Sequence, residues 1–237
     1  PATGTRAAAT YSGVASPTTA AYLPLLATAP GYRTDLTVQN TAQTQASVTI
    51  RFYDRAGTPA TKAITVPAGS ETTLDLTQVP EASFSATSGL GAAEITADRA
   101  VAVVAAVHWP HASDAYSAPG AGATTLLAPG MVRKLNADGS YDCSELIVQN
   151  TGDAAAGVHV EFISQGGTLT HTLDRTIPAH GAASYSTREL AELDDGWQGT
   201  VKVTSTNGQP LAAVSVAWLP STGVADNLAW NAVSDAT

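Results

Sequence analysis

The hexapeptide LTVQNT at residues 36–41 returns as LIVQNT at 146–151, a shift of 110 residues. Neighbouring segments repeat at nearly the same shift: SVTIRFYD at 47–54 matches GVHVEFIS at 157–164, and the turn PAGS at 67–70 matches PAHG at 178–181. A repeat of this length is about the size of one immunoglobulin-like sandwich. The chain is therefore predicted to hold two copies of one domain in series.

Both copies consist of short runs of Val, Thr and Ile between Gly and Pro, which favours strands. In the first copy Val48, Ile50 and Phe52 alternate with other residues, the period of two that places one face of a strand in a core. We predict an all-β chain with two tandem immunoglobulin-like β-sandwich domains and an extended N-terminal arm. The arm covers 1–20, the first sandwich 21–119 and the second sandwich 120–237.

The run VAVVAAVHW at 101–109 is apolar on both faces. A strand of this kind needs cover on both sides. We expect it to be a central strand, or one that the neighbouring domain covers.

The composition of the chain excludes some classes of function but does not identify one. Charged residues make up only 13% of the chain, and the net charge is −9, which repels phosphate backbones and anionic membrane surfaces. No window approaches the ~18–20 apolar residues of a membrane span. The chain begins at Pro1, and its surface residues are rich in Thr and Ser and poor in Lys. We expect a mature exported product that is extracellular or at the cell surface, with no nucleic acid as a partner.

The N-terminal arm resembles the end of each repeat. ATYSGVAS at 9–16 is similar to AYSAPGAG at 115–122 and, more loosely, to NLAWNAVS at 227–234. Residues 5–16 therefore read like a final strand without a domain, and an open sheet edge of a neighbouring molecule could accept them. Ala9, Tyr11 and Val14 form this candidate polymerisation arm. The alternatives are a linker from a longer repeat array and a segment that packs on its own first domain.

The second copy carries two insertions, at 136–143 and 186–197. In the first, Asn136, Asp138, Ser140 and Asp142 alternate around a glycine, as oxygen ligands do in a loop around a hard cation. The distal bidentate Glu is missing, and a polar turn on Asp138-Gly139 explains the same residues. We predict no metal and no cofactor, and this loop is the candidate if calcium binds. The second insertion contains the best helical window of the chain.

Catalytic patterns are lacking in the sequence. There is no GxSxG, and Asp194 and Asp195 are adjacent, so on a strand they would point to opposite faces. His159 and His171 could face each other across adjacent strands, but a zinc site needs a third ligand. Cys143 is the single cysteine, which excludes an intrachain disulfide, and we expect a buried, inert thiol. We predict that the protein is not an enzyme.

Four tryptophans are candidates for a sugar-stacking platform. Trp109 and Trp218 stand at or beside the end of the same strand in the two copies, which favours packing under the domain junction. Trp197 and Trp230 remain as possible ligand-stacking residues.

The order of motifs resembles a known repeat: YSxV, then LPLL, VQNT, VTIRFYD, the PAGS turn and GAAEI followed by VAVV. This order is similar to an uncharacterised tandem immunoglobulin-like β-sandwich repeat of long secreted surface proteins of filamentous bacteria. The resemblance covers 21–119 and 120–237, with divergence at 136–143 and 186–197. It implies an exported structural or adhesive module, and it supplies no catalytic residues.

Together these observations lead to two functional expectations. The first is an extracellular structural protein, a subunit of a surface filament or surface layer that is assembled when the N-terminal arm donates a strand to another copy of the chain. The alternative is a carbohydrate-binding or adhesin module of the cell surface, with glycans as partners.

Overall fold

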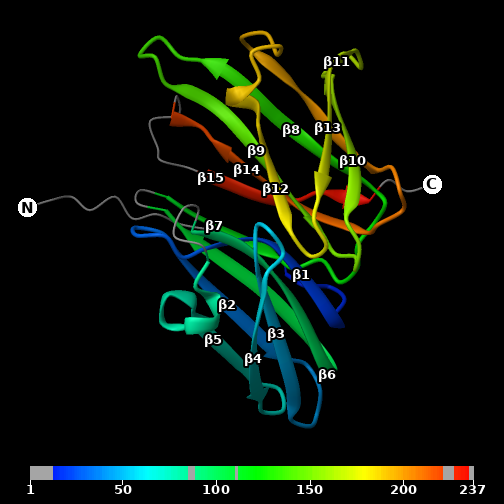
Figure 1. The fold of residues 1–237 in the computed structure, drawn as a ribbon. Coiled ribbons are helices and arrows are strands. Elements are labelled where there is room, and N and C mark those ends of the chain that lie inside the picture. Colours follow the sequence, from blue (N-terminus) through cyan, green and yellow to red (C-terminus); the bar gives the residue numbers. More distant parts are fainter. Residues whose placement is uncertain (1–12, 85–88, 110–111, 221–226, 235–237) are drawn as a thin grey trace, which may run out of the picture.

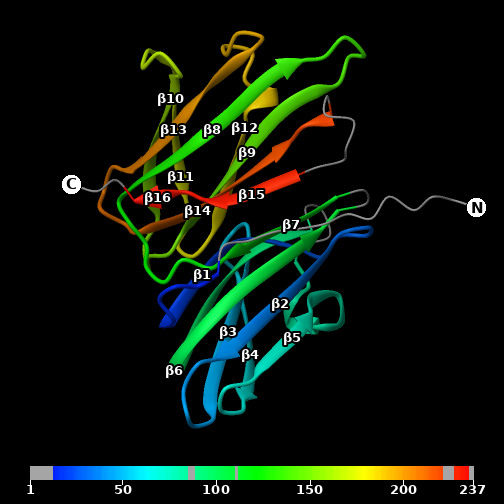
Figure 2. The same ribbon diagram turned by 180° about the vertical axis from the view of Figure 1, so that it is seen from behind.

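The computed structural model describes residues 13–84, 89–109, 112–220 and 227–234, with backbone alone at 227–230. Within these residues the regular elements are strands and short 3-10 turns (Figure 1). The strands form two antiparallel sheets, and each sheet folds into its own lobe (Figure 2). The all-β prediction is confirmed. We refer to β1–β7 as the first unit and to β8–β16 as the second unit.

The first unit contains β1 (Thr18–Ala27), β2 (Arg33–Asn40), β3 (Ala46–Asp54), β4 (Pro59–Val66), β5 (Glu71–Asp75), the 3-10 turns η1 (Leu76–Gln78) and η2 (Pro80–Ala82), β6 (Leu90–His108) and β7 (Ser113–Ser117). The second unit contains β8 (Thr125–Leu135), β9 (Tyr141–Asn150), β10 (Ala156–Ser164), β11 (Leu169–Ile177), β12 (Ala182–Ser186), η3 (Thr187–Glu189), β13 (Trp197–Ser205), β14 (Leu211–Trp218), β15 (Asn227–Asn231) and β16 (Val233–Ser234).

The long strand β6 organises the first unit because it serves two layers. Its N-terminal half pairs with β1 and β3, and its C-terminal half pairs with β2 and β7. The two halves meet at Asp98 and Arg99, which are exposed. Phe52 of β3 and Leu36 of β2 lie in one buried cluster, so the two layers face each other across a shared core. The apolar run that begins at 101 is therefore the second half of one continuous strand.

The second unit repeats this arrangement with one interruption. β13 takes the place of the first half of β6 and β14 that of the second half, because β10 pairs with β13 as β3 pairs with β6, and β9 pairs with β14 as β2 does with β6. The repeated hexapeptides therefore lie on the equivalent strands β2 and β9. Register alignment makes Val104 the counterpart of Val214, and Gln39 the counterpart of Gln149.

The repeated asparagine explains part of the hexapeptide. Asn40 donates its side-chain amide to the carbonyl oxygens of Thr44, Val66 and Pro67 at 2.7, 3.0 and 3.1 Å. Asn150 makes the same three bonds to Ala154, Ile177 and Pro178 at 2.7, 3.2 and 3.0 Å. Both residues are fully buried. One amide thus satisfies carbonyl groups from two turns, which fixes each PAGS-type turn on its sheet.

One of two local expectations differs from the structure, and the expected central strand is confirmed. The helical window at 186–197 forms only η3 and then turns, although Leu193 is buried as an apolar face would require. The C-terminal half of β6 alternates between buried and half-exposed residues, so only one of its apolar faces lies in a core. It is a central strand, flanked by β2 and β7. The strand that is buried along both faces is its counterpart β14.

We expect Asn40→Ala and Asn150→Ala each to lower the free energy of unfolding by about 2–4 kcal/mol. Each change removes the three bonds that the amide donates and the one that its oxygen accepts, from the N–H of Ala42 or Gly152, and leaves buried carbonyl groups without a donor. Urea unfolding measures the loss. The neighbouring exposed residue supplies the control, because Gln39→Ala should change stability by less than about 0.5 kcal/mol. Equal effects of Asn40→Ala and Gln39→Ala would contradict the role of the buried amide.

Candidate interaction surfaces

The last strand of the first unit carries an aromatic anchor. Tyr116 of β7 is buried, accepts a hydrogen bond from the Leu25 N–H at 3.1 Å and donates one to the Leu25 carbonyl at 2.6 Å. These bonds tie β7 to β1 at the point where β1 shifts register against β6. Burial raises the pKa of the Tyr116 hydroxyl above its ordinary value. Tyr116 therefore locks the final strand into the core.

When the candidate polymerisation arm is aligned in sequence with the ends of the two repeats, Tyr11 matches Tyr116 and Trp230. Tyr116 lies opposite Ala105, and Trp230 of β15 lies opposite Ser215, the counterpart of Ala105. The side chain of Trp230 lies outside the described residues, as do Ala9 and Tyr11 of the arm. Val14 is described and is half-buried, in a segment without strand structure that leads into β1.

The two units meet across a junction that buries the outer face of β9 and β14. Side chains on β14 alternate between two cores: Leu211 and Ala213 belong to the core of the second unit, whereas Val214 and Val216 belong to the core of the first. Ile147 of β9 joins the first core in the same way. Burying an aliphatic side chain of this size contributes about 1.5–3 kcal/mol, so the junction is a strong contact.

Polar contacts border the apolar junction. Gln149 is 1% exposed and donates to the Ala93 carbonyl of β6 at 3.4 Å. The ring of Tyr53 on β3 stacks on His180 with the centroids 4.8 Å apart, and Arg55 Nη1 bonds to Ser184 Oγ at 3.2 Å. These contacts connect β3, β6 and the turn after β3 to β9, β12 and the PAHG turn.

An aromatic cluster closes the other end of the junction. Trp109 contacts Tyr32 at a centroid distance of 5.3 Å and Trp218 of the second unit at 5.8 Å. The Trp109 indole N–H also donates to Asp114 at 2.8 Å. The prediction that Trp109 and Trp218 pack under the domain junction is confirmed.

The prediction that Trp197 stacks on a ligand is wrong, because its ring is buried. It is 6% exposed, packs edge-on against Phe162 at a centroid distance of 6.1 Å and donates its indole N–H to Thr170 Oγ1 at 3.2 Å. Trp197 is the first residue of β13, whose inward side chains fill the core, so the ring turns inward with them. The glycan-binding alternative keeps only Trp230 of the two tryptophans.

The candidate cation loop is a hydrogen-bonded turn between β8 and β9. Gly139 has a φ of 83°, and its N–H donates to the Asn136 carbonyl at 2.9 Å. Asp138 Oδ1 accepts from both the N–H and the hydroxyl of Ser140, and the Asn136 amide donates to Asp142 Oδ1 at 3.1 Å. The two bonds from Ser140 lower the pKa of Asp138. In the described residues no group of three His, Cys, Asp or Glu side chains is placed to hold a metal.

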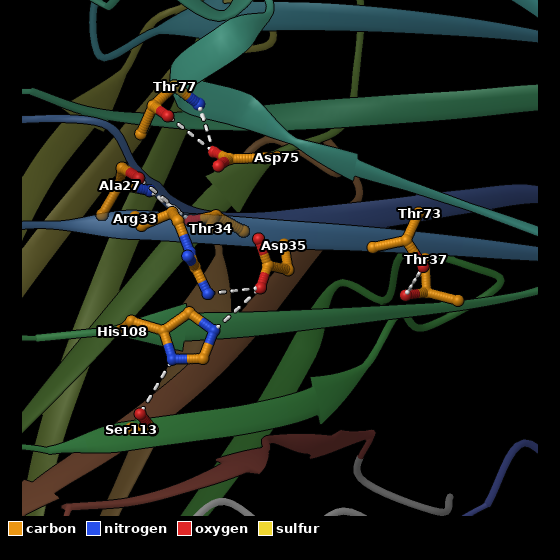
Figure 3. A network of polar contacts seen from close by, with 10 residues as sticks. All are labelled: Ala27, Arg33, Thr34, Asp35, Thr37, Thr73, Asp75, Thr77, His108 and Ser113. Carbon is orange, nitrogen blue, oxygen red and sulfur yellow. Dashed lines mark hydrogen bonds and ion pairs between the residues drawn. The ribbon is translucent and has the colours of Figure 1, made fainter. Parts of the chain in front are cut away.

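A row of polar side chains that the sequence did not suggest crosses the outer face of β2, β6 and β7 (Figure 3). His108 Nε2 lies 3.1 Å from Asp35 Oδ2, and His108 Nδ1 lies 2.9 Å from Ser113 Oγ. Arg33 Nη2 lies 2.8 Å from the same oxygen of Asp35. Hydrolases use Asp, His and Ser in such an order, but their serine must reach a substrate carbonyl. Ser113 is only 8% exposed, so we interpret the row as a tie between three strands.

The remaining candidate residues, which are two histidines, Asp195 and Cys143, do not form a common site. His159 lies opposite Asp174, with Nδ1 and Oδ1 2.7 Å apart, and His171 lies opposite Phe162, so the two histidines do not face each other. Asp195 Oδ1 accepts the Leu135 N–H at 2.6 Å. Cys143 is a buried free thiol, and burial raises its pKa, which disfavours the reactive thiolate.

The geometry defines a tandem all-β sandwich protein whose two units share an apolar junction. The chain belongs to DUF5719, a family of unknown function, whose match covers residues 4–131, more than half of the chain. No curated protein matches the chain. In the part of the chain that the structure describes, we find no helix with the length and apolar character to cross a bilayer.

Solved structures show slight likenesses. A crystal structure of Thermotoga maritima 1070 is 12% identical over 48% of this chain and 96% of its own, with a TM-score of 0.41. A β-glucuronidase of glycoside hydrolase family 2 is 12% identical over 89% of this chain and 23% of its own, with a TM-score of 0.21. A family 2 β-galacturonidase from Eisenbergiella tayi is 12% identical over 90% and 34%, with a TM-score of 0.24. The chain thus spans 23% and 34% of the length of these two hydrolases, and the likenesses carry no functional argument.

Equivalent valines provide a test of the junction. We expect Val214→Asp to lower the free energy of unfolding by about 3–5 kcal/mol, because it places an unpaired carboxylate in the apolar contact. Val104→Asp, at the half-exposed counterpart, should cost no more than about 1 kcal/mol. Thermal and urea unfolding in dilute solution compare the two. Similar losses would show that the junction is no more buried than the outer face of the first unit.

Alkaline pH should weaken the structure through Tyr53. Burial, and then the neighbouring Glu94, raise the pKa of Tyr53 to about 12. An unfolded tyrosine ionises near ~10, so the stabilisation is complete below that pH and is lost as the pH rises through about 12. Tyr53→Phe should show a smaller loss between these values. Tyr185, whose pKa is also about 12, contributes equally to both proteins. Parallel stability profiles of the two proteins would exclude a contribution from Tyr53.

Proposed function

We propose that the protein is an exported structural subunit, which forms a surface filament or layer when its N-terminal arm enters the second unit of a neighbouring copy. The observation that carries the proposal is the anchor in the final strand: Tyr116 of β7 is buried and bonded to Leu25. The arm repeats the Tyr-Ser pair of β7 with Tyr11-Ser12.

Alignment of the three segments gives the arm a specific place. Tyr11 corresponds to Tyr116 and to Trp230, and Val14 corresponds to Pro119 and to Val233. The arm precedes β1 as β7 precedes β8. A strand in this position would therefore belong to a unit that comes before the first one, and the second unit of another copy supplies such a unit.

The receiving position is the one that β15 occupies. β15 is a five-residue strand that pairs on one side with β14. Val233 in β16 is 55% exposed, so this end of the unit has apolar surface to offer. Exchange of a strand for an equivalent strand keeps the backbone hydrogen bonds and adds the contacts of the second molecule. Because donor and acceptor surfaces differ, the contact repeats head to tail and does not close.

The composition supports a place outside the cell. Only 13% of the residues are charged. A surface covered mainly by Thr, Ser, Asn and Gln suits lateral packing of many copies. Export of this chain is part of the proposal, and the resemblance to repeats of secreted surface proteins agrees with it.

Deletion of residues 1–16 tests the proposal. The full chain should form filaments or larger assemblies, visible by electron microscopy and light scattering, and the shortened chain should remain monomeric with an unchanged unfolding midpoint. A chain in which residues 5–16 are shuffled serves as the control for length and composition and should also remain monomeric. Tyr11→Ser should weaken assembly more than Tyr11→Phe, because the ring fills the anchor position. If the full and shortened chains are equally monomeric, strand donation is wrong.

A further inference from the structure

The hexapeptide that the two units share contains one residue without a structural role in the first unit. Leu36 and Val38 are fully buried, and Asn40 holds the turns. Thr41 donates its hydroxyl to the Ala100 carbonyl at 2.9 Å, as Thr151 does to Pro210 at 3.1 Å. These requirements explain why Leu, Val, Asn and Thr recur.

Gln39 is the exception. It is exposed, and its side chain makes no hydrogen bond with the described residues. Its counterpart Gln149 is buried in the junction, where it donates to the Ala93 carbonyl of the other unit. The glutamine thus has a role only where its sheet is covered by another unit.

The side chains around Gln39 repeat the pattern of the junction. Ala102, Val104 and Ala106 are half-exposed on the outer face of β6. Their counterparts on β14 are buried in the junction: Ala212 at 2%, Val214 at 0% and Val216 at 0%. The outer face of β6 in the first unit is thus equivalent to the face of β14 that is buried in the junction. In the described chain, this apolar stripe of the first unit is only partly covered.

The face that the first unit contributes to the junction also has an equivalent in the second unit, and this equivalent is not covered. Tyr53 and Ala92 of the first unit are 3% and 0% exposed where the second unit packs on them. Ile163 and Thr200 take the same register positions on β10 and β13, and both are half-exposed. The β3–β4 turn also touches the PAHG turn, because a Cβ on Gly57 would meet the Ala179 carbonyl, whereas nothing lies within 4 Å of one on Gly167, its counterpart.

We infer that the outer face of β2 and β6 in one copy of the chain packs on the outer face of β8, β10 and β13 in another copy, in the geometry of the internal junction. Gln39 then donates to the Val201 carbonyl of the neighbouring copy, because Val201 is the counterpart of Ala93. The inference rests on the proposed function, since it defines a second contact between the same two units that the arm would connect.

Charge also fits a repeated contact of this kind. The face of β3 and β6 carries Arg51 and Glu94, whose charged atoms lie 3.9 Å apart. The equivalent positions in the second unit hold Glu161 and Lys202, 3.2 Å apart. The receiving face in each unit therefore pairs its own charges. The order of the signs is reversed, which distinguishes the intermolecular contact from the internal one.

The contact between copies should be weaker than the junction. Thr37 stands where Ile147 stands in the second unit, Ala106 where Val216 does, and Glu71 where Ala182 does. Each exchange reduces the apolar surface available for burial. Assembly should therefore depend on concentration, whereas the internal junction persists in every molecule.

Cross-linking between introduced thiols tests the inference. The chain with both Gln39→Cys and Thr200→Cys should form a ladder of covalent oligomers with a short bis-maleimide at concentrations where it assembles. A mixture of the two single variants should stop at dimers. The unmodified chain, whose Cys143 is buried, is the control and should not react. Cross-linked dimers from Gln39→Cys alone would overturn the inference, since they would show that this face pairs with itself.

Assembly measurements separate the inference from strand donation. Gln39→Ala should raise the concentration needed for assembly by roughly fivefold, and Val104→Asp by more than ~100-fold. The control Ala63→Glu, on the exposed edge strand β4, should leave it unchanged. If Val104→Asp assembles normally while deletion of 1–16 abolishes assembly, the face contact is wrong and donation stands. If the shortened chain still forms the covalent ladder, donation is wrong and the face contact stands.

Discussion

Strand β14 is the constraint on which the arrangement of the molecule depends, because its side chains serve two cores at once. Leu211 and Ala213 complete the second unit, and Val214 and Val216 complete the first. A strand has a side-chain period of two, so a shift of one residue would exchange the two sets and spoil both cores together. The register of β14 against β9 therefore fixes both the interior of the second unit and the position of that unit on the first.

The architecture could be predicted because its signals are local and occur twice. Alternation in 47–54 gave the buried residues Val48, Ile50 and Phe52, and the repeated hexapeptide gave the equivalence of β2 and β9. Each signal rests on strand periodicity or on a turn, which are properties of neighbouring residues. Repetition adds a second reading of the same pattern, so an error would have to occur in both copies.

The candidate surfaces were less accessible because burial between units is not a local property. VAVVAAVHW and LAAVSVAW read alike, yet the first has one half-exposed face and the second has none. Only the arrangement of the units decides which copy is covered. Trp197 was misassigned for a related reason: it follows a polar insertion, DDG, and its inward direction depends on the register of β13. The row of Asp35, His108 and Ser113 joins residues that are far apart in sequence, so spacing gave no indication of it.

A repeat that packs on its own copy has a consequence for assembly. The internal junction joins two different faces, so each unit keeps free the equivalent of the face that the other unit contributes. The first unit keeps the face of β2 and β6, and the second unit keeps the face of β8, β10 and β13. In the proposed assembly, two different complementary faces would generate an open chain of copies and not a closed pair. Thr37 stands in place of Ile147 and Ala106 in place of Val216 at the free face, which would weaken the inferred contact relative to the junction. Within the proposal, the arm compensates for this weaker contact. A donated strand adds backbone hydrogen bonds, which do not depend on the apolar content of the face.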